Sequence, residues 1–96
     1  MFTLRTARSF KMDYERITEH NEVIKKRVMK TLQKLSQDPH GQSLRSHKVN
    51  TPHHGVRWSS WVTGDMRIIW DYDSSEQLVI ILLDIGGHSG SRKVYK

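Results

Sequence analysis

Hydrophobic positions recur at helical spacing through the first part of the chain. Phe10, Tyr14 and Ile17 are spaced as on one face of a helix. Ser9 precedes them and belongs to a residue type favoured at helix N-caps. After a corner at positions 20–21, a second apolar stripe begins and stops before Asp38-Pro39; it consists of Ile24, Val28, Leu32 and Leu35. Together the two stripes predict a helical hairpin.

The second part of the chain is patterned as β-strands. Apolar and polar residues alternate in the segment Val56–Val62. The segment Leu78–Leu83 is a continuous apolar run rich in Ile and Leu, which suits a central strand. The predicted strands are Phe2–Thr6, Leu44–Val49, Val56–Val62, Met66–Tyr72 and Leu78–Ile85. We therefore predict a single α+β domain over residues 1–96, with the N-terminal strand and helical hairpin packed on one face of a mostly antiparallel sheet of four or five strands.

The composition limits the classes of partner and the cellular location that we expect for the chain. Sixteen Lys and Arg against ten Asp and Glu give a net charge of +6, which favours nucleic acid, an anionic membrane or an acidic protein as partner. The longest apolar run, Leu78–Leu83, is far shorter than the ~20 residues that a membrane span needs, so we expect no membrane association. The absence of cysteine excludes disulfides and thiolate metal sites, and the chain opens without a charged segment leading into an apolar one. We expect a cytoplasmic location.

Six histidines are the chemical feature that most needs an explanation. No H-E-x-x-H motif is present, and the adjacent His53 and His54 would point to opposite faces of a strand, so we expect neither a metal nor another cofactor. Histidine can act as acid or base near neutral pH. RNA supplies its own nucleophile, the 2′-hydroxyl, and its cleavage requires only a base, an acid and cations around the phosphate. This composition suits a ribosome-binding or DNA-binding module equally well.

Several short motifs occur in a characteristic order. Leu44-Arg45-Ser46-His47-Lys48-Val49 precedes a strand with Met66-Arg67-Ile68-Ile69-Trp70. An apolar strand then ends in Gly86-Gly87-His88, and Val94-Tyr95 follows near the end. This order resembles the RelE/ParE superfamily of bacterial toxins, and most closely its RelE- and YafQ-like mRNA interferases, over nearly the whole chain.

The resemblance implies a function and partners. It implies the toxin component of a type II toxin–antitoxin system, a metal-independent and ribosome-dependent endoribonuclease that cleaves mRNA through the 2′-hydroxyl. The implied partners are a cognate acidic antitoxin, mRNA and the ribosome with its 16S rRNA; self-association stays open. Two alternatives remain: a ParE-like inhibitor of DNA gyrase, and a family member without turnover that only binds RNA or the ribosome.

The resemblance also implies roles for individual residues. It makes His47 a candidate for substrate contact or proton transfer, Asp65 an acidic site residue, and Arg67 a phosphate ligand. His88 matches the residue after the last strand, with an acid/base role, and Tyr95 the C-terminal aromatic. The expected RNA-binding residues are Arg45, Lys48, His54, Arg57, Arg92 and Lys93.

Structural explanations compete with these roles. Arg67 can instead pair with Asp84 or Asp71 across the sheet. Trp58 and Trp61 are three residues apart, so in a regular strand they point to opposite faces and we expect only one to be buried. The lysine-rich segment 25–34 is either a solvated helix face or a contact for ribosomal RNA.

Overall fold

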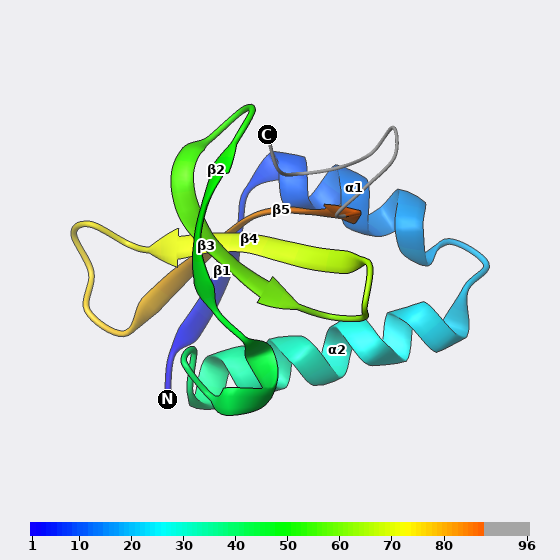
Figure 1. Cartoon of the computed structure of the whole chain (residues 1–96), viewed down its shortest axis with the longest axis horizontal. Helices are drawn as coiled ribbons and strands as arrows, with labels where there is room; N and C mark the ends of the chain where they lie inside the picture. Colours follow the sequence, from blue (N-terminus) through cyan, green and yellow to red (C-terminus); the bar gives the residue numbers. More distant parts are fainter. Residues whose placement is uncertain (88–96) are drawn as a thin grey trace.

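The structure, a computed structural model, describes residues 1–87, so His88, Arg92, Lys93 and Tyr95 lie outside the described residues. The elements are β1 (Thr3–Thr6), α1 (Arg8–Thr18), α2 (Glu22–Gln37), a short 3₁₀ helix η1 (Gln42–Leu44), β2 (His47–Thr51), β3 (Gly55–Trp61), β4 (Met66–Tyr72) and β5 (Val79–Gly87). Figure 1 shows this order by colour along the chain.

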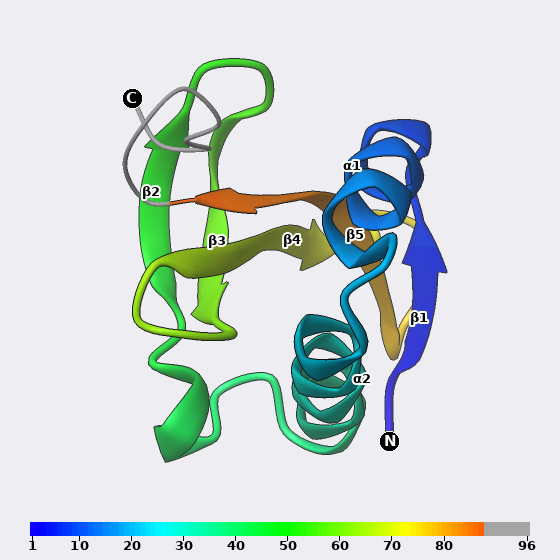
Figure 2. The same ribbon diagram turned by 90° about the vertical axis from the view of Figure 1, so that its right-hand side faces the viewer.

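The five strands form one mixed sheet in the order β1-β5-β4-β3-β2. β2 to β5 pair antiparallel in sequence order, whereas β1 runs parallel to β5. Both helices lie toward the β1–β5 side of the sheet, and the β2–β3 hairpin forms the other side (Figure 2). The predicted α+β architecture, a helical hairpin on a mostly antiparallel sheet, is confirmed.

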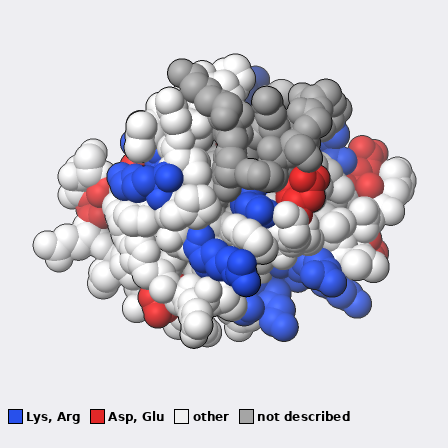
Figure 3. Space-filling model, viewed as in Figure 1, with Lys and Arg blue, Asp and Glu red and all other residues white. Residues whose placement is uncertain are grey.

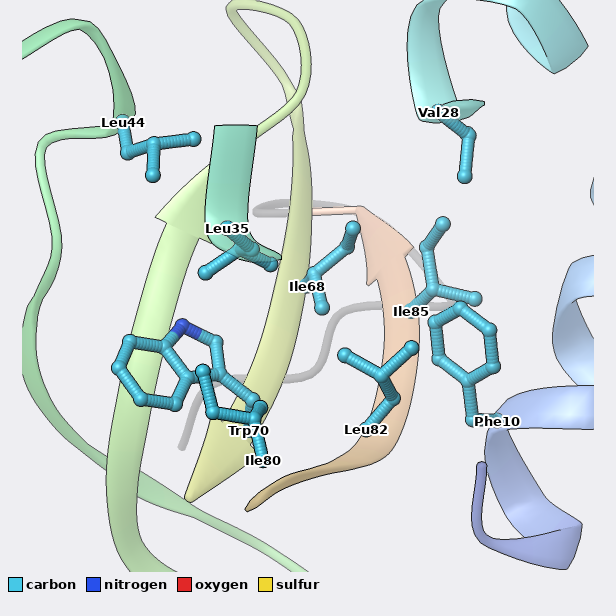
Figure 4. Close-up of a cluster of buried hydrophobic side chains, with 9 residues drawn as sticks. All are labelled: Phe10, Val28, Leu35, Leu44, Ile68, Trp70, Ile80, Leu82 and Ile85. Carbon is cyan, nitrogen blue, oxygen red and sulfur yellow. The ribbon is translucent and has the colours of Figure 1, made fainter. Parts of the chain in front are cut away.

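The core fills the space between the helices and one face of the sheet. α1 contributes Phe10, and α2 contributes Val28 and Leu35, which point toward the strands in Figure 4. The strands supply their own buried side chains: Ile68 and Trp70 from β4, and Ile80, Leu82 and Ile85 from β5. In residues 1–87 neither helix combines the length and apolarity that crossing a membrane requires.

Several predicted boundaries are wrong by a few residues. Helix α1 begins at Arg8 with Ala7 as N-cap, and Ser9 lies inside the helix, where its hydroxyl donates a hydrogen bond to the Leu83 carbonyl. Because Leu44 is buried in the core at the end of η1, the strand that was expected to begin there starts only at His47. The corner before α2 is confirmed: the Asn21 side chain accepts a hydrogen bond from the Ile24 N–H and caps the helix.

Candidate functional site

Strand register brings the two central candidates onto one face of the sheet. His47 in β2 lies opposite Ser59 in β3, and Trp61 in β3 lies opposite Arg67 in β4. Side chains that are directly opposite, or two residues apart on one strand, share a face. His47, Ser59, Trp61 and Arg67 therefore line the face turned away from the core cluster, which we call the outer face.

The Trp61 indole is the centre of this face. The guanidinium carbon of Arg67 lies 4.1 Å from the centroid of the Trp61 ring, and that of Arg45 lies 4.4 Å from it. Guanidinium groups at such distances are attracted to the negative face of an aromatic ring. An open hollow of about 770 Å³ adjoins this arrangement and is lined by Gln42, Ser43, Arg45 and Trp61.

Arg67 is held by the turn between β3 and β4. Its Nη1 donates to the carbonyl oxygens of Thr63 and Met66 at 2.7 and 3.1 Å, and its Nη2 donates to that of Gly64 at 3.1 Å. The residue is only 4 % exposed, and its Nε is buried without a hydrogen-bond partner. Hydrogen bonds from a buried charged group are stronger than neutral ones, so Arg67 stabilises this turn.

The ion pairs considered for Arg67 are not formed. Asp71 instead accepts a hydrogen bond from Nη1 of Arg57 at 2.9 Å, and Asp84 faces His54. The expectation that Arg67 pairs with either aspartate is therefore wrong. Arg57, a candidate for RNA binding, has part of its charge balanced by this contact, and its Nε donates to the His54 carbonyl at 2.9 Å.

Backbone geometry orients His47. Its Nδ1 lies 2.8 Å from the carbonyl oxygen of Arg45, and because a carbonyl can only accept, Nδ1 carries a proton and donates. In the neutral ring the lone pair therefore resides on Nε2. Arg45 has φ of 48°, in the left-handed region that non-glycine residues rarely adopt, and this conformation follows directly on η1.

A chain of hydroxyl groups holds the segment before β2 in place. Trp70 Nε1 donates to Ser60 Oγ at 2.7 Å, and Ser46 Oγ donates to the Pro39 carbonyl at 2.6 Å. The 2.6 Å contact between the two serines must then use the Ser60 proton, because the Ser46 proton is already committed. This network ties the loop that carries Arg45 to the buried centre of the sheet.

Lys48 does not lie on the same face of the sheet as His47. Neighbouring residues of a strand point to opposite faces, and the Lys48 ammonium lies 5.2 Å from the Trp58 ring centroid on the core side of the sheet. The Trp58 ring stacks on Trp70 at 5.7 Å, and the His40 ring meets its edge at 4.6 Å. The prediction that Trp58 and Trp61 face opposite ways is confirmed, although both are half-buried where only one was expected to be buried.

His54 and Asp84 form a second, largely buried pair. His54 Nε2 lies 3.7 Å from Asp84 Oδ2 and is buried without a hydrogen-bond partner. Burial, followed by hydrogen bonding with Asp13, raises the pKa of Asp84 to about 7. Burial, and then the charges of His53 and Arg57, lower the pKa of His54 below its ordinary value. The contact is therefore not a stable ion pair near neutral pH, because each environment favours the uncharged form.

Asp65 lies in the β3–β4 turn that Arg67 stabilises. Its backbone N–H donates to the Thr63 hydroxyl at 3.3 Å, and the residue is exposed. Within the described chain, no three His, Asp or Glu side chains are arranged so as to hold a metal ion. The structure thus brings His47, Trp61 and Arg67 to one face of the sheet, with Arg45 against the Trp61 ring, and leaves Lys48 on the other face. Asp65 lies in the turn that follows Trp61.

Sequence reasoning missed the hydroxyl network and the central role of Trp61. The only signal for Trp61 was its place in a strand between two arginine-bearing segments. The left-handed conformation of Arg45 has no signal in the residue type, because Gly and Asn are the residues that normally indicate it.

Several solved structures with a similar fold are bacterial toxins. A metal-bound toxin from Helicobacter pylori is 17 % identical, with a TM-score of 0.71 over 92 % of this chain and 96 % of that one. A YoeB/ParE toxin from Agrobacterium tumefaciens is 15 % identical, with a TM-score of 0.71 over 92 % of this chain and 100 % of that one. The chain has the fold of these toxins.

A third similar structure is the DinJ-YafQ complex from E. coli, which is 11 % identical, with a TM-score of 0.69 over 92 % of this chain and 94 % of that one. By sequence, no family model and no curated protein matches the chain. The likeness at these identities concerns the fold, and it confirms the RelE/ParE-like architecture that the motifs indicated.

Proposed function

We propose that the chain is the toxin of a type II toxin–antitoxin system, a metal-independent and ribosome-dependent endoribonuclease that cleaves mRNA in the cytoplasm. The observation that carries the proposal is the outer face: an oriented imidazole, His47, beside an aromatic ring held between two guanidinium groups. The fold shared with YoeB, ParE and YafQ toxins supports it.

The chemistry assigns the base role to His47. Its Nε2 lone pair takes the proton of the 2′-hydroxyl, and the resulting oxygen attacks the adjacent phosphorus. The bond from phosphorus to the 5′-oxygen breaks, and that oxygen takes a proton from an acid, for which His88 remains the candidate. The products are a 2′,3′-cyclic phosphate and a 5′-hydroxyl, so the 2′-hydroxyl of the RNA is the only nucleophile required.

Arg45 contacts the substrate in this proposal, and Trp61 and Arg67 support it. Arg45 is exposed, and its fork of donors matches the oxygens of a phosphate. The Trp61 ring holds the Arg45 guanidinium in place beside the site. Arg67 adds positive charge beside the Trp61 ring, and Asp65 and Tyr95 are further candidates. The remaining candidates are proposed to contact the RNA backbone away from the scissile bond; they are Lys48, His54, Arg57, Arg92 and Lys93.

The proposed partners are the ribosome, through 16S rRNA, and an acidic antitoxin. The net charge of +6 favours both. Among the structures with this fold, YafQ is in a complex with DinJ and a YoeB of Staphylococcus aureus is in a complex with YefM. We propose an equivalent inhibitor for this chain.

The test is expression of the chain in bacteria with primer extension on mRNA. The wild type is expected to arrest growth and to cut translated messages, and His47→Ala is expected to lower cleavage about 10²–10⁴-fold. Lys11→Ala, which changes an exposed residue of α1, is the matched control and should cut like the wild type. Cleavage by His47→Ala at the wild-type rate would overturn the assignment of the base. Gyrase-dependent SOS induction without cuts would instead support the ParE-like alternative.

One observation favours a second candidate, an RNA- or ribosome-binding protein without turnover. The Nη1 and Nη2 groups of Arg67 are engaged with three carbonyl oxygens of its own turn, which is the behaviour of a structural arginine. This candidate predicts growth arrest and ribosome binding by wild type and His47→Ala alike, without any cut in the message.

A further inference from the structure

Strand register places Asp84 of β5 on the outer face, next to two elements that are distant from it in the sequence. Asp84 lies opposite Ile69 of β4, and Ile69 lies opposite Ser59, a residue of the outer face. The turn between β2 and β3 brings the His54 ring to this position, with Nε2 3.7 Å from Asp84 Oδ2. Helix α1 approaches the same aspartate through Asp13. Three separate segments of the chain therefore meet at one carboxyl group.

Helix α1 reaches Asp84 because the neighbouring strand β1 is short. β1 pairs with β5 only as far as Leu82, and α1 then packs along β5, with the Ser9 hydroxyl on the Leu83 carbonyl. Asp13, one turn further along α1, forms a side-chain hydrogen bond with Asp84. Two carboxyl groups can make such a bond only when one of them is protonated, since a carboxylate has no donor. The contact between α1 and β5 therefore holds a proton.

The proton belongs to Asp84 rather than to Asp13. Asp84 is only 8 % exposed, and burial disfavours its charged form. Asp13 is more exposed than Asp84 and contacts the guanidinium of Arg16, which favours its ionised form. The pKa of Asp84, about 7, accordingly places the loss of this proton near neutral pH.

The His54 ring packs against this carboxyl group without charge. Among the described residues its buried Nε2 has no hydrogen-bond partner, and 3.7 Å is too long for a hydrogen bond to Asp84. Burial, and then the charges of His53 and Arg57, lower the pKa of the ring. A neutral imidazole therefore lies beside a protonated carboxyl group.

The charges that act on this contact are local. Figure 3 shows that Lys and Arg side chains gather along the lower side of the molecule, where α2 lies in Figure 1, whereas the β2–β3 turn is at the upper side. Arg57 of β3 is itself paired with Asp71 of β4. In the described chain, the other charged or titratable groups that face the contact are Asp13 and Arg16 of α1 and His53 of the turn.

We propose that Asp84, His54 and Asp13 form a proton-dependent clamp, which holds the β2–β3 turn against β5 and α1 and releases it as the pH rises. With a proton on Asp84, the clamp joins the three elements without a charge on its buried carboxyl group. When that proton leaves, two carboxylates face each other, and the buried one has only a neutral ring beside it. Detachment of the turn lets water reach the Asp84 carboxylate and exposes the β5 part of the outer face.

The hairpin keeps its own contacts when the clamp opens. The His54 N–H donates to the Thr51 hydroxyl at 2.9 Å, and the His54 carbonyl accepts from Arg57 Nε at 2.9 Å. Neither bond involves Asp84. Release therefore moves the turn away from β5 and α1 as a unit, without unfolding the hairpin.

The experiment measures the distance between the turn and α1 by NMR of the full chain. The chain contains no cysteine, so Met12→Cys on α1 takes a spin label at a single position, and Met12 is 61 % exposed. The label broadens nearby amide signals, including those of His53 and Gly55 while the turn is held. We expect their broadening to fall as the pH rises through about 7, whereas Ile80 and Leu82 of β5 should keep theirs.

Two substitutions in the labelled chain separate the proton from the packing. Asp84→Asn has no charge at any pH, and its amide can still donate to Asp13, so the turn should stay close to α1 in alkaline solution. His54→Ala removes the ring that packs against Asp84, so the turn should be released over the whole pH range.

Two residues of α1 are expected to move the transition in opposite directions. Asp13→Asn removes a charge that disfavours ionisation of Asp84, so release should occur at lower pH. Arg16→Gln removes a charge that favours ionisation, so release should occur at higher pH. Glu15→Gln changes an exposed residue of the same helix and is the matched control, which should release the turn at the wild-type pH.

The clamp is overturned if the broadening of the turn in the wild type is the same at every pH, or if Asp84→Asn still releases the turn. Shifts of the same sign in Asp13→Asn and Arg16→Gln would also overturn it. Loss of broadening in β5 together with the turn would mean that the whole fold loosens, and the clamp would again be wrong. None of these measurements involves RNA, so the clamp and the nuclease proposal stand or fail separately.

Discussion

The Nδ1 atom of His47 donates a hydrogen bond to the carbonyl oxygen of Arg45 across 2.8 Å, and the left-handed backbone of Arg45 follows directly on helix η1. A residue two positions earlier in the chain therefore sets the tautomer of the candidate base. The neutral imidazole is expected to carry its proton on Nδ1, and ¹⁵N NMR of the histidine side chains in alkaline solution checks this. A ring protonated mainly on Nε2 would contradict the assigned role.

Arg45 contributes both its left-handed backbone and its guanidinium to the site, and two substitutions separate these contributions. Both Arg45→Gly and Arg45→Ala remove the guanidinium. Glycine adopts the left-handed backbone without strain, whereas alanine keeps the strain. We expect Arg45→Gly to be more stable than Arg45→Ala by about 1 kcal/mol in chemical denaturation. Cleavage should fall in both variants, because both lose the proposed phosphate contact. Wild-type cleavage by Arg45→Gly would show that only the backbone of this residue matters.

Arg67 is expected to be a stability residue as well as a site residue. Arg67→Lys cannot reproduce the donors to Thr63, Gly64 and Met66, so the free energy of unfolding should fall by about 2–3 kcal/mol. Arg5→Lys, at an exposed pair with Glu76, is the control and should lower the free energy of unfolding much less. Equal losses in the two variants would mean that the turn contacts contribute little.

The hydroxyl network makes Ser60 more important than its size indicates. Ser60→Ala leaves the buried Trp70 N–H and the Ser46 hydroxyl with fewer partners, so we expect a loss of about 1–3 kcal/mol in the free energy of unfolding. Ser74→Ala, in an exposed loop, is the comparison and should lie within about 0.5 kcal/mol of the wild type. The prediction fails if the two variants are equally stable.

Burial of Asp84 gives stability a defined pH dependence. Its pKa is about 7 in the folded chain, well above the value of an unfolded aspartate, so between these values the folded state binds more protons. The contribution of Asp84 to stability is therefore fully present below about pH 4 and is lost as the pH rises through about 7. Denaturation curves of Asp84→Asn and wild type should differ little at low pH, and at pH 8 the variant should be more stable by on the order of 2–4 kcal/mol. His54, whose lowered pKa acts in the opposite sense at acid pH, is present in both proteins and lies 3.7 Å from Asp84.

The fold was predictable because its signals are local. Apolar spacing identified both helices, the capping role of Asn21 matched the corner between them, and strand alternation placed Trp58 and Trp61 on opposite faces. The start of β2 was not predictable, because whether Leu44 begins a strand or ends a 3₁₀ turn depends on the core that it enters.

The candidate site was predictable as a set of residues but not as an arrangement. The alternation that separates Trp58 from Trp61 also separates His47 from Lys48, a consequence that the motif alone does not reveal. The partners of Arg67 are main-chain carbonyl groups. Because every residue has such a group, the residue types in the sequence do not predict which carbonyls accept. Ion pairs such as Arg57 with Asp71 depend on register between strands, which a single sequence leaves open.

The parallel pairing of β1 with β5 has a consequence for synthesis. Thr3 meets Val79, so the first strand finds its neighbour only after almost the entire described chain has been made. A nascent chain that still lacks β5 has no partner for β1 and lacks the β5 side chains that pack against the helices. β1 therefore stays unpaired while the whole segment between it and β5 is synthesised, and a contact of such long sequence separation slows folding.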